Sequence, residues 1–277
     1  MKNLLGIMQG RLLQKYQRRY QAHPVQYWQK EFPIAKEIGL DCIEFILDYN
    51  EIELNPLICD GGIPEILQAT SETGVQVKTI CADYFMEQPL HSIDKEVAGR
   101  SLEILRKLLT ISEQLGATDI VIPCVDKSSL SGKEDERRFV SIIQSIMEDA
   151  ENKCINLSLE MDLPPKSFKK LLDKLQSKNI TVNYDIGNSA SLGYDPVAEL
   201  DAYGDRISDI HIKDRVRGGG SVFLGKGSAD FDRFFKKLRE FDYSGPFIFQ
   251  AYRDDEGVFA FKKQFDWIAQ YLEKYKS

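Results

Sequence analysis

The sequence lacks paired cysteines, long apolar runs and an excess of basic residues, and each shortage excludes a class of protein. Its five cysteines are odd in number and show no C-x-x-C spacing, which indicates reduced thiols in a cytoplasmic protein rather than a disulfide framework. No window approaches the roughly 18 apolar residues of a membrane span, and Gln9 and Arg11 interrupt the first apolar run. We therefore expect neither a membrane protein nor a signal peptide.

The balance of charge limits the partners that we expect. The chain has 36 Lys and Arg residues against 43 Asp and Glu residues, a formal net charge of −7. Nucleic-acid binding depends on neutralising phosphates with basic side chains, so this acidic chain argues against it. A small molecule, for which a local basic site is enough, is the expected partner. Because the chain shows no linker, low-complexity tract or shift of composition, we interpret residues 1–277 as a single domain.

Short strand-like runs alternate with amphipathic helical runs along the whole chain. Helices between consecutive strands imply parallel β-α units, and eight units in about 250 residues fit a closed barrel better than an open sheet. The sequence thus predicts an α/β fold, a single (β/α)8 TIM barrel. The predicted strands are 4–9, 42–46, 75–82, 119–124, 155–160, 180–185, 207–212 and 246–250, and the predicted helices are about 27–38, 63–73, 94–115, 134–153, 165–178, 196–203, 230–241 and 257–275.

Three successive predicted strands carry one apolar and one polar face, because side chains alternate along a strand. The apolar residues would pack against covering helices, and the polar residues would face the barrel interior. At the carboxyl ends of these strands, where active sites of such barrels lie, the polar faces end in Glu160, Asp185 and His211. Each residue alone has an ordinary interpretation, as a cap or as a member of an ion pair. Together, in register on three strands, they favour a divalent-cation site.

Three motifs carry a resemblance to a known superfamily: IMQGR in the first strand, NYDIGNSASLGYDP at the sixth and HIKD at the seventh. They resemble the xylose-isomerase-like sugar isomerases and epimerases, which include ketose 3-epimerases, hydroxypyruvate isomerases and hexulose-phosphate isomerases or epimerases. The resemblance covers essentially the whole chain. It implies that Glu160, Asp185 and His211 hold one divalent metal ion (Mn2+, Zn2+, Co2+ or Mg2+) and that Arg217 binds substrate.

The sequence departs from the superfamily at the end of the eighth strand, where FIFQAYR has Gln250 in place of the glutamate that is the fourth ligand. An amide oxygen can coordinate a hard cation, but it cannot act as a base. The resemblance implies that the 3-epimerases use two glutamates on opposite faces of the substrate carbon, and here only Glu160 remains. Gln250 therefore favours isomerisation, or an epimerisation whose second acid is another residue. Asp83 and Glu44 are candidates for that second acid.

A glycine-rich segment with basic side chains follows His211 and indicates an anchor for an anionic substrate such as a sugar phosphate. Gly225 and Gly227 precede Ser228, a good N-cap for the next helix, and a helix N-terminus after strand seven or eight is a common phosphate site in barrels. An ordinary flexible loop is an equal alternative. The basic residues at this rim are Arg11, Lys213, Arg215, Arg217, Lys226 and Arg253, of which Arg11 and Arg217 lie best relative to strand ends.

The connection 12–28 is long for a β-α loop and rich in Tyr, Arg and Gln. It has two interpretations, a lid that excludes water from an enediolate or a contact between subunits of a homo-oligomer. The sequence does not decide between them.

We therefore predict a metal-dependent sugar or sugar-phosphate isomerase or epimerase that acts through an enediolate, with Glu160 as the base. One alternative is a dehydratase of a keto-sugar or keto-polyol, which begins with the same proton abstraction. Another is a catalytically altered sugar-binding barrel, because of Gln250. Related apurinic-site endonucleases use a histidine-rich zinc cluster, which three histidines disfavour. The predicted metal ligands are Glu160, Asp185, His211 and Gln250, and the predicted substrate contacts are Arg11, Glu44, Asp83, Asn188, Lys213, Arg217 and Arg253.

Overall fold

The computed structural model describes residues 3–276, without the side chain of residue 276, and within this range eight parallel strands close into a barrel. Each strand pairs with its neighbours in sequence, and β1 pairs with β8, where Gly6 lies opposite Ile248. The prediction of a (β/α)8 barrel is confirmed. The strands are β1 (Leu5–Met8), β2 (Cys42–Ile46), β3 (Gln76–Cys81), β4 (Asp119–Cys124), β5 (Asn156–Met161), β6 (Ile180–Asp185), β7 (Ile207–Ile212) and β8 (Phe247–Phe249).

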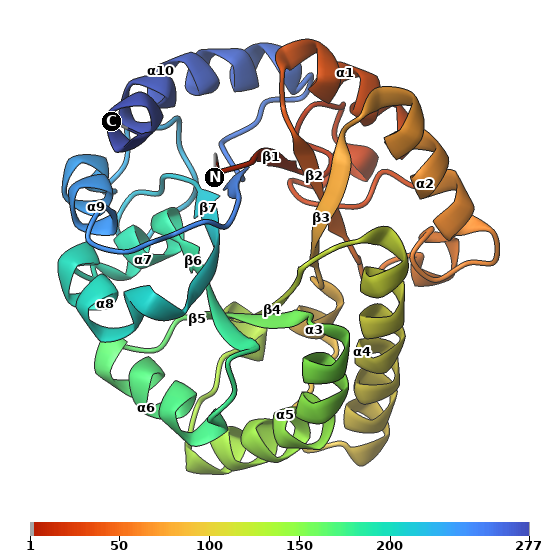
Figure 1. Cartoon of the computed structure of the whole chain (residues 1–277), viewed down its shortest axis with the longest axis vertical. Coiled ribbons are helices and arrows are strands. Elements are labelled where there is room, and N and C mark those ends of the chain that lie inside the picture. Colours follow the sequence, from red (N-terminus) through yellow and green to blue (C-terminus); the bar gives the residue numbers. More distant parts are fainter. Residues whose placement is uncertain (1–2, 277) are drawn as a thin grey trace.

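Helices form a ring around the barrel (Figure 1). The longest ones have clear end signals. In α4 the Asp94 carboxylate accepts hydrogen bonds from the backbone N–H of Glu96 and Val97, and Gly116 ends the helix in a left-handed conformation with φ of 69°. The helices are α1 (Glu31–Ile38), α2 (Gly62–Thr73), α3 (Tyr84–Glu87), α4 (Lys95–Leu115), α5 (Lys133–Lys153), α6 (Pro165–Leu175), α7 (Ile186–Leu192), α8 (Pro196–Tyr203), α9 (Phe231–Leu238) and α10 (Val258–Lys276).

The sequence predicted every strand to within a residue or so at each end, but it missed two short helices, α3 and α7. α7 follows β6 without a loop, and the Asp185 carboxylate accepts a hydrogen bond from the backbone N–H of Asn188. Its segment, IGNSASL, contains small polar residues and a glycine, which have low intrinsic helix propensity. A local cap therefore forms this helix against its composition.

The two halves of the barrel differ in polarity. An apolar cluster lies among β1 to β4 and β8, and its buried members are Met8, Cys42, Ile46, Cys81, Val121 and Ile248. The strands β5 to β7 carry buried hydroxyl groups, amides, carboxylates and an imidazole, so the polar site lies against an apolar wall. Among the helices of residues 3–276, none combines the length and apolar character that crossing a bilayer requires.

Candidate active site

Three strand ends bring Glu160, Asp185 and His211 together. His211 Nδ1 lies 3.9 Å from Glu160 Oε2 and 3.9 Å from Asp185 Oδ2. Each residue offers one ligand atom, and these atoms all lie within 4.8 Å of one another. All three side chains are buried. The register of β6 and β7, which sets Asp185 opposite His211, produces this arrangement.

Two carboxamides fix the Glu160 carboxylate. Asn183, on the inward face of β6, donates to Glu160 Oε2 at 3.1 Å, and Asn188, on α7, donates to Glu160 Oε1 at 2.6 Å. Burial, together with the negative charge of Asp185, raises the pKa of Glu160 to about 7. A group with a pKa near neutrality gains and releases a proton readily at physiological pH.

The D-I-G-N and H-I-K-D motifs meet around Asp185. Lys213 Nζ lies 3.0 Å from Asp185 Oδ2 and also donates to Asn188 Oδ1 at 3.1 Å. Gly187 makes this possible, since a Cβ there would come within 2.7 Å of Lys213 Cγ. Arg215 adds a second hydrogen bond to Asn188 Oδ1, at 2.8 Å. The two motifs thus hold a carboxylate and an amide in fixed positions at the rim of the barrel.

Beneath His211 lies a second buried carboxylate group. Glu44 Oε1 is 2.8 Å from His211 Nε2. Asp209 is buried close to both, and burial together with the charge of Glu44 raises its pKa well above its ordinary value. Burial lowers the pKa of His211, but the carboxylates of Glu44, Glu160 and Asp185 outweigh it and raise this pKa to about 9. Several buried ionisable groups therefore lie close together around His211.

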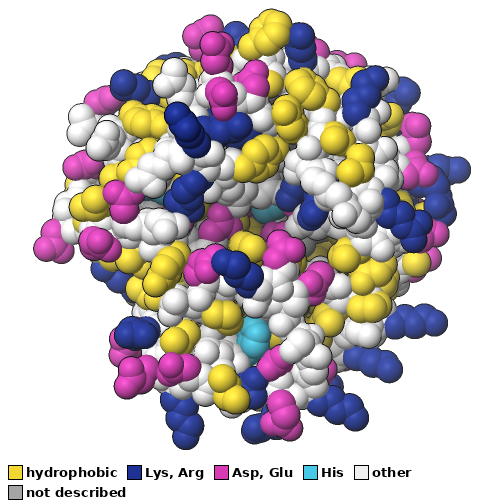
Figure 2. Space-filling view, turned by 180° about the vertical axis from the view of Figure 1, so that it is seen from behind, with side chains coloured by type: hydrophobic (Ala, Val, Ile, Leu, Met, Phe, Trp, Pro, Cys, Tyr) yellow, Lys and Arg dark blue, Asp and Glu magenta, His cyan; other side chains and the backbone are white. Residues whose placement is uncertain are grey.

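A cavity of about 290 Å³ opens above these residues. In Figure 2, basic and acidic side chains gather around the hollow near the centre of this face. Of the predicted substrate contacts, the structure places three in the cavity wall together with Glu160 and Gln250 and leaves four outside it. Those in the wall are Asp83, Asn188 and Lys213, and those outside are Glu44, Arg11, Arg217 and Arg253.

One glutamine of the loop 12–28 joins the other side of the cavity. Gln21 Oε1 accepts hydrogen bonds from Gln250 Nε2 at 2.9 Å and from Arg11 Nη2 at 2.7 Å, and Gln21 Nε2 donates to Asp83 Oδ2 at 2.6 Å. Because arginine only donates, it fixes the orientation of the Gln21 amide, which in turn fixes that of Gln250. Gln250 Oε1 is buried and accepts no hydrogen bond from the part of the chain that is described.

Arg11 and Arg253 contact the first residues of the chain around the loop 12–28 and do not line the cavity. Arg253 Nη1 donates to Gly10 O at 2.6 Å, and Glu31 accepts hydrogen bonds from the backbone N–H of Gly10 at 2.6 Å and of Leu12 at 2.9 Å. Arg11 stacks over Tyr20, with the guanidinium carbon 4.7 Å from the ring centre. Burial lowers the pKa of both arginines and raises that of Glu31 to about 7. These groups set the path of the loop that carries Gln21.

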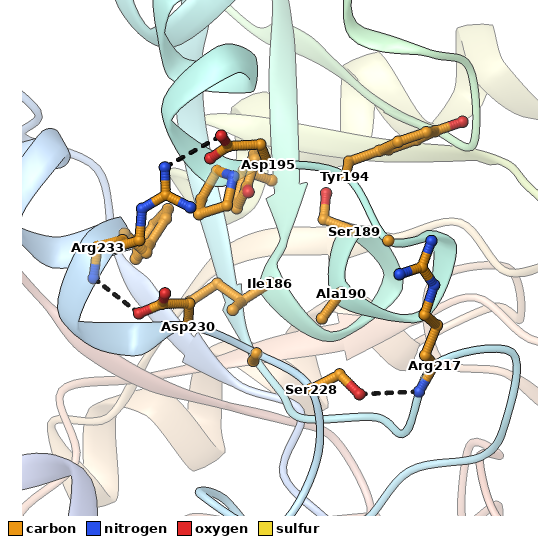
Figure 3. Close-up of a pocket in the computed structure, with 14 residues that line it drawn as sticks. Ile186, Ser189, Ala190, Tyr194, Asp195, Arg217, Ser228, Asp230 and Arg233 are labelled. Atoms are coloured by element: carbon orange, nitrogen blue, oxygen red, sulfur yellow. Dashed lines mark hydrogen bonds and ion pairs between the residues drawn. The ribbon is translucent and has the colours of Figure 1, made fainter.

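Arg217 lies in a different pocket, between α7, α8 and α9 (Figure 3). Its backbone N–H donates to Ser228 Oγ at 2.9 Å, and its guanidinium packs against Gly193, where a Cβ would come within 2.7 Å. The predicted N-cap Ser228 is wrong, because the Asp230 carboxylate caps α9 by accepting a hydrogen bond from the backbone N–H of Arg233. Arg215, not Arg217, reaches the cavity wall.

The backbone of the glycine-rich segment donates hydrogen bonds to a carboxylate of the same chain. Asp214, the last residue of H-I-K-D, accepts hydrogen bonds from the backbone N–H of Gly225 at 2.9 Å, Gly227 at 2.8 Å and Ala229 at 3.1 Å. Its carboxylate occupies three backbone N–H donors of the segment, so these are not free to bind a phosphate. The segment is therefore an ordered loop built around a buried carboxylate.

Sequence reasoning missed several residues of the site. Asn183 stood on the predicted polar face of its strand, and that parity was the signal that could have found it. Gln21, Arg19 and Asp48 also line the cavity, and Arg19 Nη1 lies 2.7 Å from Asp48 Oδ2. They come from loops, where no periodicity indicates which side chains turn inward.

The residues present fit a divalent cation. Two carboxylates and an imidazole within reach of one another form a suitable O,O,N donor set, and the unpartnered Gln250 Oε1 is a neutral oxygen in the same cavity. A bound cation would favour the ionised form of the buried carboxyl groups around His211.

Fold, motifs and donor set together define a family, and residues 32–271 match the xylose isomerase-like TIM barrel family, to which this chain belongs. Among curated proteins it is 28% identical over 259 residues to the putative L-ribulose-5-phosphate 3-epimerase UlaE of Shigella dysenteriae, covering 89% of this chain and 90% of that one. The L-ribulose-5-phosphate 3-epimerase UlaE of Escherichia coli (strain SMS-3-5) matches with the same identity and coverage. These relatives are sugar epimerases, which are isomerases.

Solved structures share the fold. An L-ribulose 3-epimerase superposes with a TM-score of 0.76 at 18% identity, covering 100% of this chain and 96% of that chain. The 3-keto-D-glucoside 4-epimerase YcjR of E. coli gives a TM-score of 0.75 at 17% identity, covering 97% and 100%. The IOLI protein with a bound zinc atom gives 0.78 at 14% identity, covering 98% and 99%.

Proposed function

We propose that this protein is a metal-dependent sugar or sugar-phosphate epimerase or isomerase, and that 3-epimerisation of a ketose or ketose phosphate is its reaction. The observation that carries the proposal is the convergence of Glu160, Asp185 and His211 at three strand ends, with Glu160 and Gln250, whose Oε1 is unpartnered, in the wall of one cavity. The relatives named as L-ribulose-5-phosphate 3-epimerases support the reaction type.

Glu160, Asp185 and His211, with Gln250 as a neutral fourth donor, would hold one divalent cation, which supplies polarisation of the substrate carbonyl and stabilisation of negative charge when bound. Glu160 removes the proton from the carbon next to the carbonyl, and the electron pair of that C–H bond gives an enediolate. Asn183 and Asn188 hold the carboxylate in position for this transfer. Lys213 and Arg215 would bind substrate hydroxyl or phosphate oxygens from the cavity wall.

The test joins metal content to proton exchange. Protein purified without chelator is analysed by mass spectrometry for metal, and L-ribulose 5-phosphate, L-ribulose and D-allulose are each incubated with it in D2O. We expect about one Mn, Zn, Co or Mg ion per chain and deuterium at the carbon next to the carbonyl of at least one ketose. Glu160→Gln should remove both exchange and epimerisation. A protein that neither contains nor takes up a divalent ion would contradict the proposal and favour a sugar-binding barrel.

A further inference from the structure

An epimerase needs a second proton carrier, because inversion requires that the new proton arrive on the face opposite to the one from which Glu160 removes the first. The carboxamide of Gln250 neither accepts nor releases a proton at neutral pH. Another side chain of the cavity wall must therefore carry the second proton, an inference that rests on the proposed function.

Most ionisable groups of the cavity wall are already committed. Asp48 pairs with Arg19 at 2.7 Å, and Glu87 pairs with Lys127 at 2.7 Å. Lys213 binds Asp185 and Asn188, on the same side of the cavity as Glu160. Arginine remains protonated in proteins, which excludes Arg215. Tyr49 and Asp126 also line the cavity, but their side chains are exposed to solvent, whereas that of Asp83 is partly buried.

Asp83 is different from these groups. Within residues 3–276 it forms no ion pair, and its oxygens accept hydrogen bonds from Gln21 Nε2 at 2.6 Å and Cys81 Sγ at 3.3 Å. It directly precedes α3, yet its side chain caps no backbone N–H of that helix, so the usual structural role of such an aspartate is absent. Burial raises its pKa, which increases the population of the protonated acid.

The carboxyl groups of Glu160 and Asp83 are oriented by different neighbours. Glu160 is turned toward β6 and α7 by Asn183 and Asn188. Asp83 is turned toward the loop 12–28 and β8, because Gln21 joins it to Gln250. Both line the cavity, and β4 separates their strands.

We propose that Asp83 is the second acid-base residue of the reaction, acting on the substrate face opposite to Glu160. As the acid, Asp83 gives its proton to the carbon of the enediolate, whose C=C electron pair forms the new C–H bond while the carbonyl re-forms. Asp83 becomes a carboxylate and Glu160 keeps the proton that it removed, and both return to their starting states by exchange with solvent. In the reverse direction the two residues exchange roles.

The test is Asp83→Asn, studied in D2O with whichever ketose the unaltered protein epimerises. We expect epimerisation to fall at least about 100-fold, while the epimer whose hydrogen faces Glu160 still acquires deuterium at a rate within about threefold of the unaltered protein. The other epimer should exchange no hydrogen. A matched control is Asp60→Asn, an exposed carboxylate that does not line the cavity, and both rates should remain unchanged in it.

A second variant guards against a purely structural effect. The double variant Asp83→Asn with Gln250→Glu has a carboxyl group at position 250, which the Gln21 carboxamide joins to position 83. It should restore part of the epimerisation, with metal content equal to that of the unaltered protein. Asp83→Asn that epimerises at a normal rate, or that loses exchange of both epimers while folded and metal-bound, would overturn the assignment of Asp83. An unaltered protein with no exchange on any ketose would instead overturn the proposed function, and the role of Asp83 with it.

Discussion

The two sides of the cavity are built in different ways. On the β5–β7 side, Glu160, Asp185 and His211 sit at consecutive strand ends, where the barrel itself fixes their spacing. On the side of β8 and β1, Gln250 reaches its orientation through Gln21, a residue of a loop. The first side uses backbone register and the second uses a chain of side-chain amides. A substitution should therefore act locally on the first side and at a distance on the second.

The largest effect is expected on the strand side. Asp185→Asn removes a charged ligand while keeping the side-chain volume, so metal affinity should fall more than about 100-fold, beyond the range typical of changes outside the ligand shell. Titration of metal-free protein with Mn2+, followed by electron paramagnetic resonance, measures this affinity. Asp173→Asn, an exposed position on α6, is the matched control. Equal affinities of the two variants would contradict the site.

An intermediate effect is expected at Glu31, which anchors the loop, in the pH dependence of the free energy of unfolding. Burial raises the pKa of Glu31 from 4.5 to about 7, so between these values the unfolded chain ionises while the folded protein stays protonated. The free energy of unfolding should therefore fall by about 3 kcal/mol as pH rises through this window, with no further change above it. Glu31→Gln lacks this contribution. Urea unfolding of both proteins at pH 4.5 to 7.5 checks it, and parallel pH profiles would show that the Glu31 pKa is ordinary.

The smallest effect should come from the loop itself. Gln21→Leu keeps the approximate volume but removes the groups that orient Gln250 and bind Asp83. Of the three hydrogen bonds that Gln21 makes, the one from Gln250 bears on the proposed fourth metal donor, and its loss corresponds to roughly a 10-fold weaker metal affinity and slower epimerisation. Gln14→Leu, exposed on the same loop, is the control in both assays. If Gln21→Leu behaves like this control, the two sides of the cavity are not built differently.

The same contrast explains what the sequence could predict. Strand parity and β-α order led to the barrel and to the meeting of Glu160, Asp185 and His211, because both follow from backbone periodicity. Periodicity contains no information on Gln21, whose position depends on the anchors Glu31 and Arg253 more than 200 residues apart. Arg217 and Arg215 show the same limit, since two residues of a turn decide which guanidinium faces the cavity.

The Asp214 carboxylate bears on how the protein could distinguish a free sugar from a sugar phosphate. A free phosphate that approached the glycine-rich loop would meet an intramolecular competitor, tethered to the preceding strand and therefore present at a high effective concentration. The loop is in this sense already saturated. Selectivity between a free sugar and its phosphate would then depend on the cationic side chains of the cavity wall, Lys213 and Arg215, and not on the backbone donors of Gly225, Gly227 and Ala229.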